Sequence, residues 1–190
     1  MSLPMTTESR VKKLDSEKYV EGYATLFDKP YEMYEYDGLK YYESVSSLAL
    51  DDADLSVVIL RYDHKGKVLA RNSNHTLGVV ADTRGLFVCA DLTKSRAAGD
   101  LYEEIQNGLI NKMSWAFKVS EESYDKENRT RKILKIAKVY DVSAVGIPAS
   151  SDTDITARSY FDGVIEVEKR EALARETQLL KLKINLEVLP

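Results

Sequence analysis

A serine within an alternating segment is the first residue whose surroundings suggest chemistry. Residues 107–117 read Asn-Gly-Leu-Ile-Asn-Lys-Met-Ser-Trp-Ala-Phe, and from Met113 onward apolar residues alternate with small or polar ones. A period of two is typical of a β-strand with one buried face, so we expect Ser114 on the face opposite Met113 and Trp115. A rigid strand can hold a hydroxyl within the roughly 3–3.5 Å of a carbonyl carbon that nucleophilic attack requires. Ser114 is therefore the candidate nucleophile, provided that a base and an acid accompany it.

His64 is the candidate base. It follows an apolar, β-branched run at residues 55–62, and the loops that leave strand ends often hold functional groups on a rigid scaffold. If that strand continues, His64 shares a face with Tyr62. A neutral imidazole can take the proton of a serine hydroxyl, which is otherwise a weak nucleophile. The other histidine, His75, lies in the polar segment Arg-Asn-Ser-Asn-His-Thr, where we expect it to be solvated.

Asp141 is the candidate acid. It stands inside the apolar run Val-Tyr-Asp-Val-Ser-Ala-Val, where an unpaired charge would be costly, so it needs a partner, and His64 is one candidate. Asp63 adjoins His64 but points the opposite way if the strand continues, which makes it the weaker choice. Spacing alone leaves His64, Ser114 and Asp141 as three residues of three expected strands.

Metal and cofactor chemistry have little support in the sequence. The two histidines are eleven positions apart, which matches no common zinc spacing, and neither GxxxxGK[ST] nor GxGxxG is present. Cys89 is the single cysteine, which excludes an intramolecular disulfide and a thiolate metal cluster. Its alternating surroundings, Leu-Phe-Val-Cys-Ala, favour a structural role. We expect no cofactor and no metal.

The composition is that of a soluble globular protein. The 190 residues are 44% hydrophobic and 31% charged, and this length is enough for one domain with an appendage or for two very small domains. The net charge of −4 argues against a nucleic-acid partner, because phosphate contacts need a basic surface. No apolar stretch approaches the roughly 20 residues that span a bilayer, and no signal-peptide pattern is present. We therefore expect a cytoplasmic protein without a membrane partner.

The expected elements are mostly short strands separated by turn sequences. Strands are predicted at residues 19–27, 39–45, 55–62, 67–70, 76–81, 86–92, 113–119 and 133–147, a helix at 95–107 and a short helix within 44–54. This pattern favours an antiparallel β-barrel or a strongly curved sheet with helices packed on it. We divide the chain into a flexible N-terminal arm (1–16), a main domain (17–158) and a charged, helical C-terminal appendage (159–190). The end of that appendage, residues 182–188, also alternates like a strand.

Five motifs in register resemble one protein family. They are Gly22-Tyr23-Ala24, Arg61-Tyr62-Asp63-His64, Leu101-Tyr102-Glu103, Met113-Ser114-Trp115-Ala116-Phe117 and Tyr140-Asp141-Val142-Ser143. Their order and spacing are similar to those of the prohead maturation proteases of tailed phages, in the clan of herpesvirus assemblin-like serine proteases. The resemblance covers about residues 19–158.

The resemblance implies a fold and a set of site residues. The implied fold is mainly β with helices (α+β), a closed antiparallel β-barrel surrounded by helices. The family's histidine falls on His64 and its serine on Ser114. The acidic position falls on Asp141, where many relatives have glutamate. In the herpesvirus enzymes the third member is a histidine, which keeps His75 as an outside candidate.

The implied function is a serine endopeptidase of phage capsid maturation. Its substrates would be the scaffold segment and N-terminal delta region of the major capsid protein and the protease itself, inside the assembling prohead in the host cytoplasm. The appendage would be a scaffold-docking helix that self-cleavage trims. The oligomeric state stays open, with a homodimer or higher oligomer as options. Two alternatives remain: a non-catalytic capsid-assembly or scaffolding module with the same barrel, and a binding domain that uses the tyrosine-rich surface at 19–42.

Overall fold

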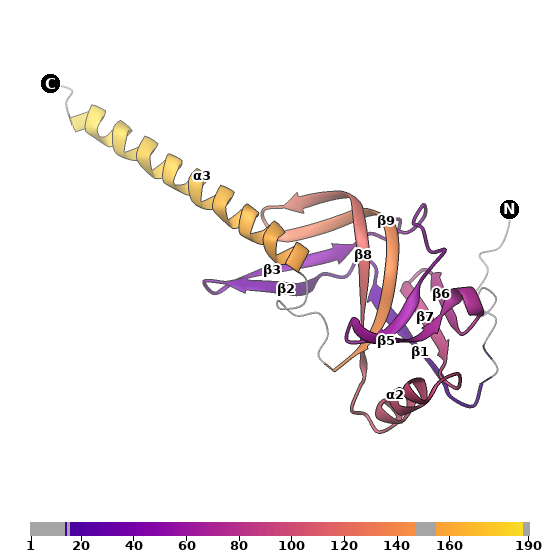
Figure 1. The fold of residues 1–190 in the computed structure, drawn as a ribbon. Coiled ribbons are helices and arrows are strands. Elements are labelled where there is room, and N and C mark those ends of the chain that lie inside the picture. Colours follow the sequence, from indigo (N-terminus) through magenta and orange to yellow (C-terminus); the bar gives the residue numbers. More distant parts are fainter. Residues whose placement is uncertain (1–13, 15, 147–154, 188–190) are drawn as a thin grey trace.

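The computed structural model describes residues 14, 16–146 and 155–187, and Figure 1 shows their arrangement. The strands are β1 (Tyr19–Leu26), β2 (Tyr31–Tyr36), β3 (Leu39–Val45), β4 (Ile59–Tyr62), β5 (Lys65–Arg71), β6 (Leu77–Ala81), β7 (Gly85–Asp91), β8 (Lys112–Asp125) and β9 (Thr130–Val145). The helices are the short 3₁₀ helix η1 (Asn72–Asn74), α2 (Arg96–Gln106) and α3 (Ile155–Glu187).

The strands form two sheets. The smaller sheet is antiparallel, in the order β1-β7-β6. The larger is mixed, in the order β2-β3-β9-β4-β5, with β8 on the other edge of β9. Buried apolar side chains from both sheets form one core, which includes Val45, Leu60, Leu86 and Val142. The two sheets therefore fold as one unit, although ladders of hydrogen bonds do not join them among the described residues.

The expected closed antiparallel barrel surrounded by helices is wrong. The sheets are open, and β9 pairs in parallel with β3 along its first residues and with β4 along its last residues. A barrel would need a continuous ring of paired strands. In the described part of the chain, only an isolated bridge between Phe27 and Val45 links the smaller sheet to the larger one. Neither α2 nor α3 surrounds the sheets (Figure 1).

Helix α2 follows the predicted range closely. The Ser95 hydroxyl accepts a hydrogen bond from the Ala98 N–H at 3.1 Å and caps the first turn. Ala98 and Leu101 are buried against the core, which gives the helix its apolar face. The predicted short helix within 44–54 is wrong, because residues 47–52 form turns.

Helix α3 is anchored to the sheets near its beginning and extends away from them toward its end (Figure 1). Ile165 packs with Met33 and Tyr41 in a small second core. The Tyr41 and Tyr124 hydroxyls donate hydrogen bonds to Glu168 at 3.4 and 3.3 Å. The side chains of residues 171–179 are exposed. Several tyrosines of the 19–42 segment thus contribute to a core rather than to a free binding surface.

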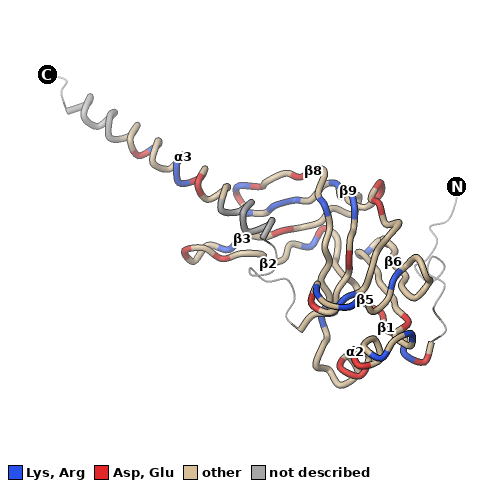
Figure 2. The backbone as a smooth tube through the Cα atoms, in the orientation of Figure 1, with Lys and Arg blue, Asp and Glu red and all other residues tan. Residues whose placement is uncertain are grey.

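Lysine and arginine residues are interspersed with aspartate and glutamate along β8, β9 and α3, as Figure 2 shows. Several of these charges form pairs, including Lys135 with Glu121 at 2.9 Å and Lys138 with Asp54 at 2.7 Å. Among the described helices, none combines the length and apolar character needed to cross a membrane.

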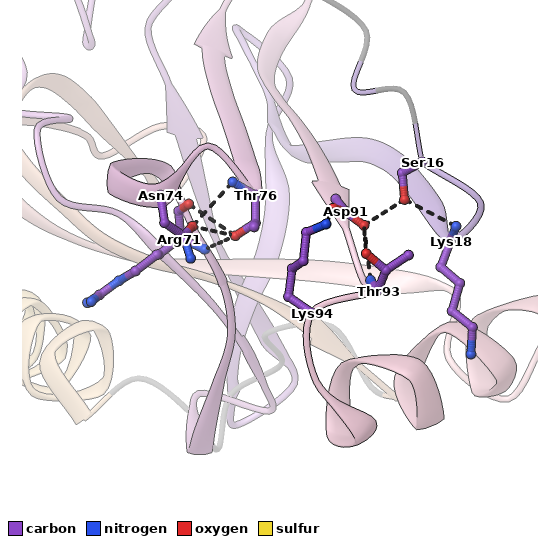
Figure 3. Close-up of polar contacts among 8 residues, drawn as sticks. All are labelled: Ser16, Lys18, Arg71, Asn74, Thr76, Asp91, Thr93 and Lys94. Atoms are coloured by element: carbon purple, nitrogen blue, oxygen red, sulfur yellow. Dashed lines mark hydrogen bonds and ion pairs between the residues drawn. The ribbon is translucent and has the colours of Figure 1, made fainter.

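Two polar contact networks stabilise connections between strands away from the β8–β9 pair (Figure 3). The Thr76 hydroxyl accepts a hydrogen bond from the Arg71 N–H at 2.9 Å and donates to Asn74 at 2.7 Å. Asp91, at the end of β7, accepts hydrogen bonds from the Ser16 and Thr93 hydroxyls at 2.6 and 2.7 Å. Each network uses a buried side chain to fix the backbone of a turn or loop.

Candidate active site

The antiparallel pair of β8 and β9 brings two of the candidate residues onto one face. Ser114 lies opposite Ser143, and Ala116 lies opposite Asp141. Directly opposed residues share a face of a sheet, so the side chains of Ser114, Ser143 and Asp141 project to the same side. Their neighbours Trp115 and Val142 project to the other side and belong to the main core. The alternation read from the sequence therefore places Ser114 on the correct face.

The third candidate comes from the hairpin between β4 and β5. Tyr62 pairs with Lys65, so Asp63 and His64 are a two-residue hairpin loop. Their φ angles are 48° and 57°, as a type I′ turn requires of its two central residues. The Asp63 N–H donates to the Ala144 carbonyl of β9 at 3.0 Å. The strand thus ends at Tyr62, as predicted, so the condition under which His64 would share a strand face with Tyr62 is not met.

In this turn the His64 ring bridges the other two candidates. Its Nε2 lies 2.8 Å from the Ser114 Oγ, and its Nδ1 lies 2.7 Å from the Asp141 Oδ1. With the proton on Nδ1 donated to Asp141, Nε2 is free to accept the Ser114 proton. Ser114 and Asp141 are buried at 6% and 8% exposure, whereas the His64 side chain is 26% exposed. A carboxylate, an imidazole and a hydroxyl in this order are able to activate the hydroxyl as a nucleophile.

The other residues considered from the sequence lie outside this arrangement. Asp63 is exposed, and it is Asp141 rather than Asp63 that binds the imidazole. His75 is exposed at the end of η1 in a left-handed conformation. Cys89 is fully buried in β7, and burial raises the pKa of its thiol, which disfavours the nucleophilic thiolate. The sequence-based preference for Asp141 over Asp63 thus agrees with the geometry.

Ser143 is a site residue for which the sequence interpretation had no role. Its side chain is fully buried, and its hydroxyl donates to the Asp141 Oδ1 at 3.0 Å. The same hydroxyl oxygen accepts a hydrogen bond from the His64 backbone N–H at 3.1 Å. The available signal is its position two residues after Asp141, which places both side chains on one face of a strand.

A groove with a volume of about 1150 Å³ opens beside Ser114 and His64. One wall consists of the consecutive residues 112–122 of β8. Successive side chains of a strand point to opposite faces, so a groove that contacts all of them follows the edge of the strand rather than one face. In the described part of the chain, β9 is the only strand paired with β8, which leaves its other edge toward the groove.

A buried ionic cluster lines the same groove near Glu122, which follows Ser114 toward the end of β8. The Arg131 guanidinium contacts the Glu43 carboxylate at 2.9 Å and, through Nε, the Glu122 carboxylate at 2.9 Å. Arg131 and Glu43 are 6% and 2% exposed in their side chains. The Tyr31 hydroxyl also donates to Glu43. These contacts join β2, β3, β8 and β9 and fix the shape of this part of the groove.

The hydroxyl, imidazole and carboxylate define a site of the serine-hydrolase type. Comparison with family models gives the particular family. A model described as caudovirus prohead serine protease matches residues 6–164, and the chain belongs to this family. The family indicates a serine protease of phage capsid maturation that acts inside the prohead. Comparison with curated proteins and with solved structures gave no match.

Proposed function

We propose that this protein is an endopeptidase with Ser114 as nucleophile, His64 as general base and acid, and Asp141 as the residue that orients and stabilises the imidazole. The contacts of the His64 ring with both other side chains, at 2.8 and 2.7 Å, are the observation that supports this assignment. The proposed substrates are the scaffold segment and N-terminal delta region of the major capsid protein and the protease itself, inside the prohead.

The proposed reaction has two halves. In the first, the Ser114 Oγ bonds to the peptide carbonyl carbon while its proton moves to the His64 Nε2, and Asp141 stabilises the imidazolium. His64 then gives this proton to the leaving amine as the C–N bond breaks, which leaves an acyl-enzyme. In the second half, water gives a proton to His64 and attacks the ester carbonyl. The C–O bond to Ser114 breaks, and the proton returns to the serine oxygen.

The groove beside Ser114 suits an extended polypeptide. The eleven residues of β8 that line it span roughly 35 Å at about 3.3 Å per residue, a length that accommodates about ten substrate residues. An extended segment can form backbone hydrogen bonds with an unpaired strand edge, while side-chain pockets supply selectivity. We therefore propose that the substrate binds along β8 with its scissile bond at Ser114.

A paired incubation tests this function. Wild type, Ser114→Ala and Ser123→Ala are each incubated with the capsid protein encoded by the same phage or prophage, and fragments are identified by mass spectrometry. Ser123 is an exposed serine of β8 that does not line the groove, so its replacement is a matched control. We expect the same discrete fragments from wild type and Ser123→Ala and none from Ser114→Ala.

Two other outcomes contradict the proposal in different ways. If none of the three proteins cleaves the capsid protein, in crowded and kosmotropic buffers as well, the non-catalytic assembly module replaces the protease. If all three cleave it, the protein is a protease but Ser114 is not its nucleophile. Cleavage by wild type and Ser123→Ala alone also gives the sequence preference at the scissile bond.

A further inference from the structure

We infer that Ser143 is a positioning residue that keeps the base His64 and the acid Asp141 aligned with each other; the inference rests on the proposed function. Its hydroxyl contacts both the base and the acid: it accepts from the His64 backbone N–H at 3.1 Å and donates to the Asp141 Oδ1 at 3.0 Å. Ser143 also lies directly opposite Ser114 in the β8–β9 ladder.

The backbone of His64 needs such support. The φ angle of His64 is 57°, and a non-glycine residue in this left-handed region is strained and persists where neighbouring structure holds it. Two N–H groups tie the turn to β9: Asp63 donates to the Ala144 carbonyl and His64 donates to the Ser143 hydroxyl. The second of these bonds depends on a side chain, so a single substitution can remove it.

The same hydroxyl also fixes the carboxylate. The Asp141 Oδ1 receives the Ser143 hydroxyl proton and lies 2.7 Å from the His64 Nδ1. A serine hydroxyl accepts through its lone pairs and donates its own hydrogen, so Ser143 can accept from the His64 N–H and donate to Asp141 at the same time. The His64 turn and the Asp141 carboxylate are thus both hydrogen-bonded to one buried atom, the Ser143 Oγ on β9. Without this atom, we expect the imidazole and carboxylate to sample misaligned positions, and displacements of about 1 Å can reduce rates about 100-fold.

Ser143→Ala tests this role, with Thr76→Val as the control. Thr76 is also a buried hydroxyl that receives and donates hydrogen bonds at a turn, but it lies at η1 (Figure 3). A fluorophosphonate phosphonylates an activated serine oxygen as the P–F bond breaks and the serine proton leaves with the fluoride. Intact-mass measurements of this labelling give kinact and KI without knowledge of the natural substrate. Thermal unfolding of each variant is measured in parallel.

We expect Ser143→Ala to lower kinact about 10–100-fold with KI changed less than twofold, whereas Thr76→Val lowers Tm and leaves kinact within twofold of wild type. The loss should also depend on Asp141. In an Asp141→Asn background, adding Ser143→Ala should lower kinact by a smaller factor than it does in wild type, because the charged carboxylate that Ser143 positions is already absent while the His64 turn still loses its hydrogen bond.

Two results would overturn the positioning role. One is a Ser143→Ala protein that labels as fast as Thr76→Val. The other is a pair of losses, from Ser143→Ala and Asp141→Asn, that multiply fully in the double variant, as independent structural effects would. Both results leave the proposed protease intact if wild type labels at Ser114 and cleaves capsid protein. Failure of wild type itself to label or cleave refutes the protease function instead.

Discussion

Replacing Asp141 by asparagine isolates the contribution of its charge. Asparagine has nearly the same shape, and its carbonyl oxygen can still accept from His64 Nδ1 and from the Ser143 hydroxyl, so the fold should change little. The imidazolium formed during attack, however, loses a negative partner at 2.7 Å. Coulomb's law gives about 6 kcal/mol for unit charges at this separation and an effective dielectric constant of 20. That energy corresponds to a rate factor of between about 10⁴ and 10⁵.

Solvent reduces this figure. The His64 side chain is 26% exposed, so water screens part of the interaction, and we expect kinact to fall about 10³–10⁴-fold. The assay is fluorophosphonate labelling of Ser114 followed by intact mass, with Tm measured on the same samples. Asp54→Asn is the matched control, because it makes the same chemical change in a partly exposed pair with Lys138, a residue of β9 that does not contact His64 or Ser114. A labelling rate of Asp141→Asn within tenfold of the Asp54→Asn rate would refute an electrostatic role for Asp141.

Two further predictions concern stability. Arg131→Leu should lower the free energy of unfolding by about 3–5 kcal/mol, because the Glu43 carboxylate stays buried without its cation; urea denaturation measures the loss, and one below about 1 kcal/mol would contradict the reasoning. At Asp91, burial raises the carboxyl pKa, but hydrogen bonds from Ser16 and Thr93 lower it more, and the net pKa lies well below its usual range. The folded-state pKa is thus below the unfolded one, so the stabilisation is complete at about pH 5 and above and is lost progressively as the pH falls further. Asp91→Asn should therefore be less stable than wild type by roughly 2 kcal/mol at pH 7, and the difference between the urea midpoints should shrink as the pH falls below about 5; a constant difference would contradict this origin.

The candidate site was largely accessible from the sequence because its side chains follow strand periodicity. Alternation placed Ser114 opposite the Trp115 row, and the cost of burying an unpaired charge singled out Asp141. The contacts of His64 depend instead on a turn. The end of the strand at residue 62 was predicted, but Asp63 and His64 lack the glycine that usually marks a two-residue hairpin, so the tight turn that aims the imidazole was not.

The sheet topology was less accessible, since its decisive pairings are not local. The hairpins of β2 with β3 and of β8 with β9 follow from adjacent strands and short turns. The parallel pairings of β9 with β3 and β4 join segments far apart in the sequence, and alternation within a strand does not reveal which neighbour it has or in which direction. The prediction of a closed barrel was therefore wrong, although most of the strands were predicted near their observed positions.

The two type I′ hairpins show what the site requires of the backbone. Asp37 and Gly38 form the turn between β2 and β3, with φ angles of 51° and 73°, and glycine adopts this conformation at low cost. Asp63 and His64 adopt the same kind of turn with histidine in the place of the glycine. A histidine within β4 would have its direction set by the pleat, whereas at this turn position its ring reaches both Ser114 and Asp141 on a neighbouring strand pair. The left-handed backbone of His64 is strained, but it is what lets the imidazole contact both Ser114 and Asp141. Whether this arrangement is kept depends on the two hydrogen bonds that the turn donates to β9, to the Ala144 carbonyl and to the Ser143 hydroxyl.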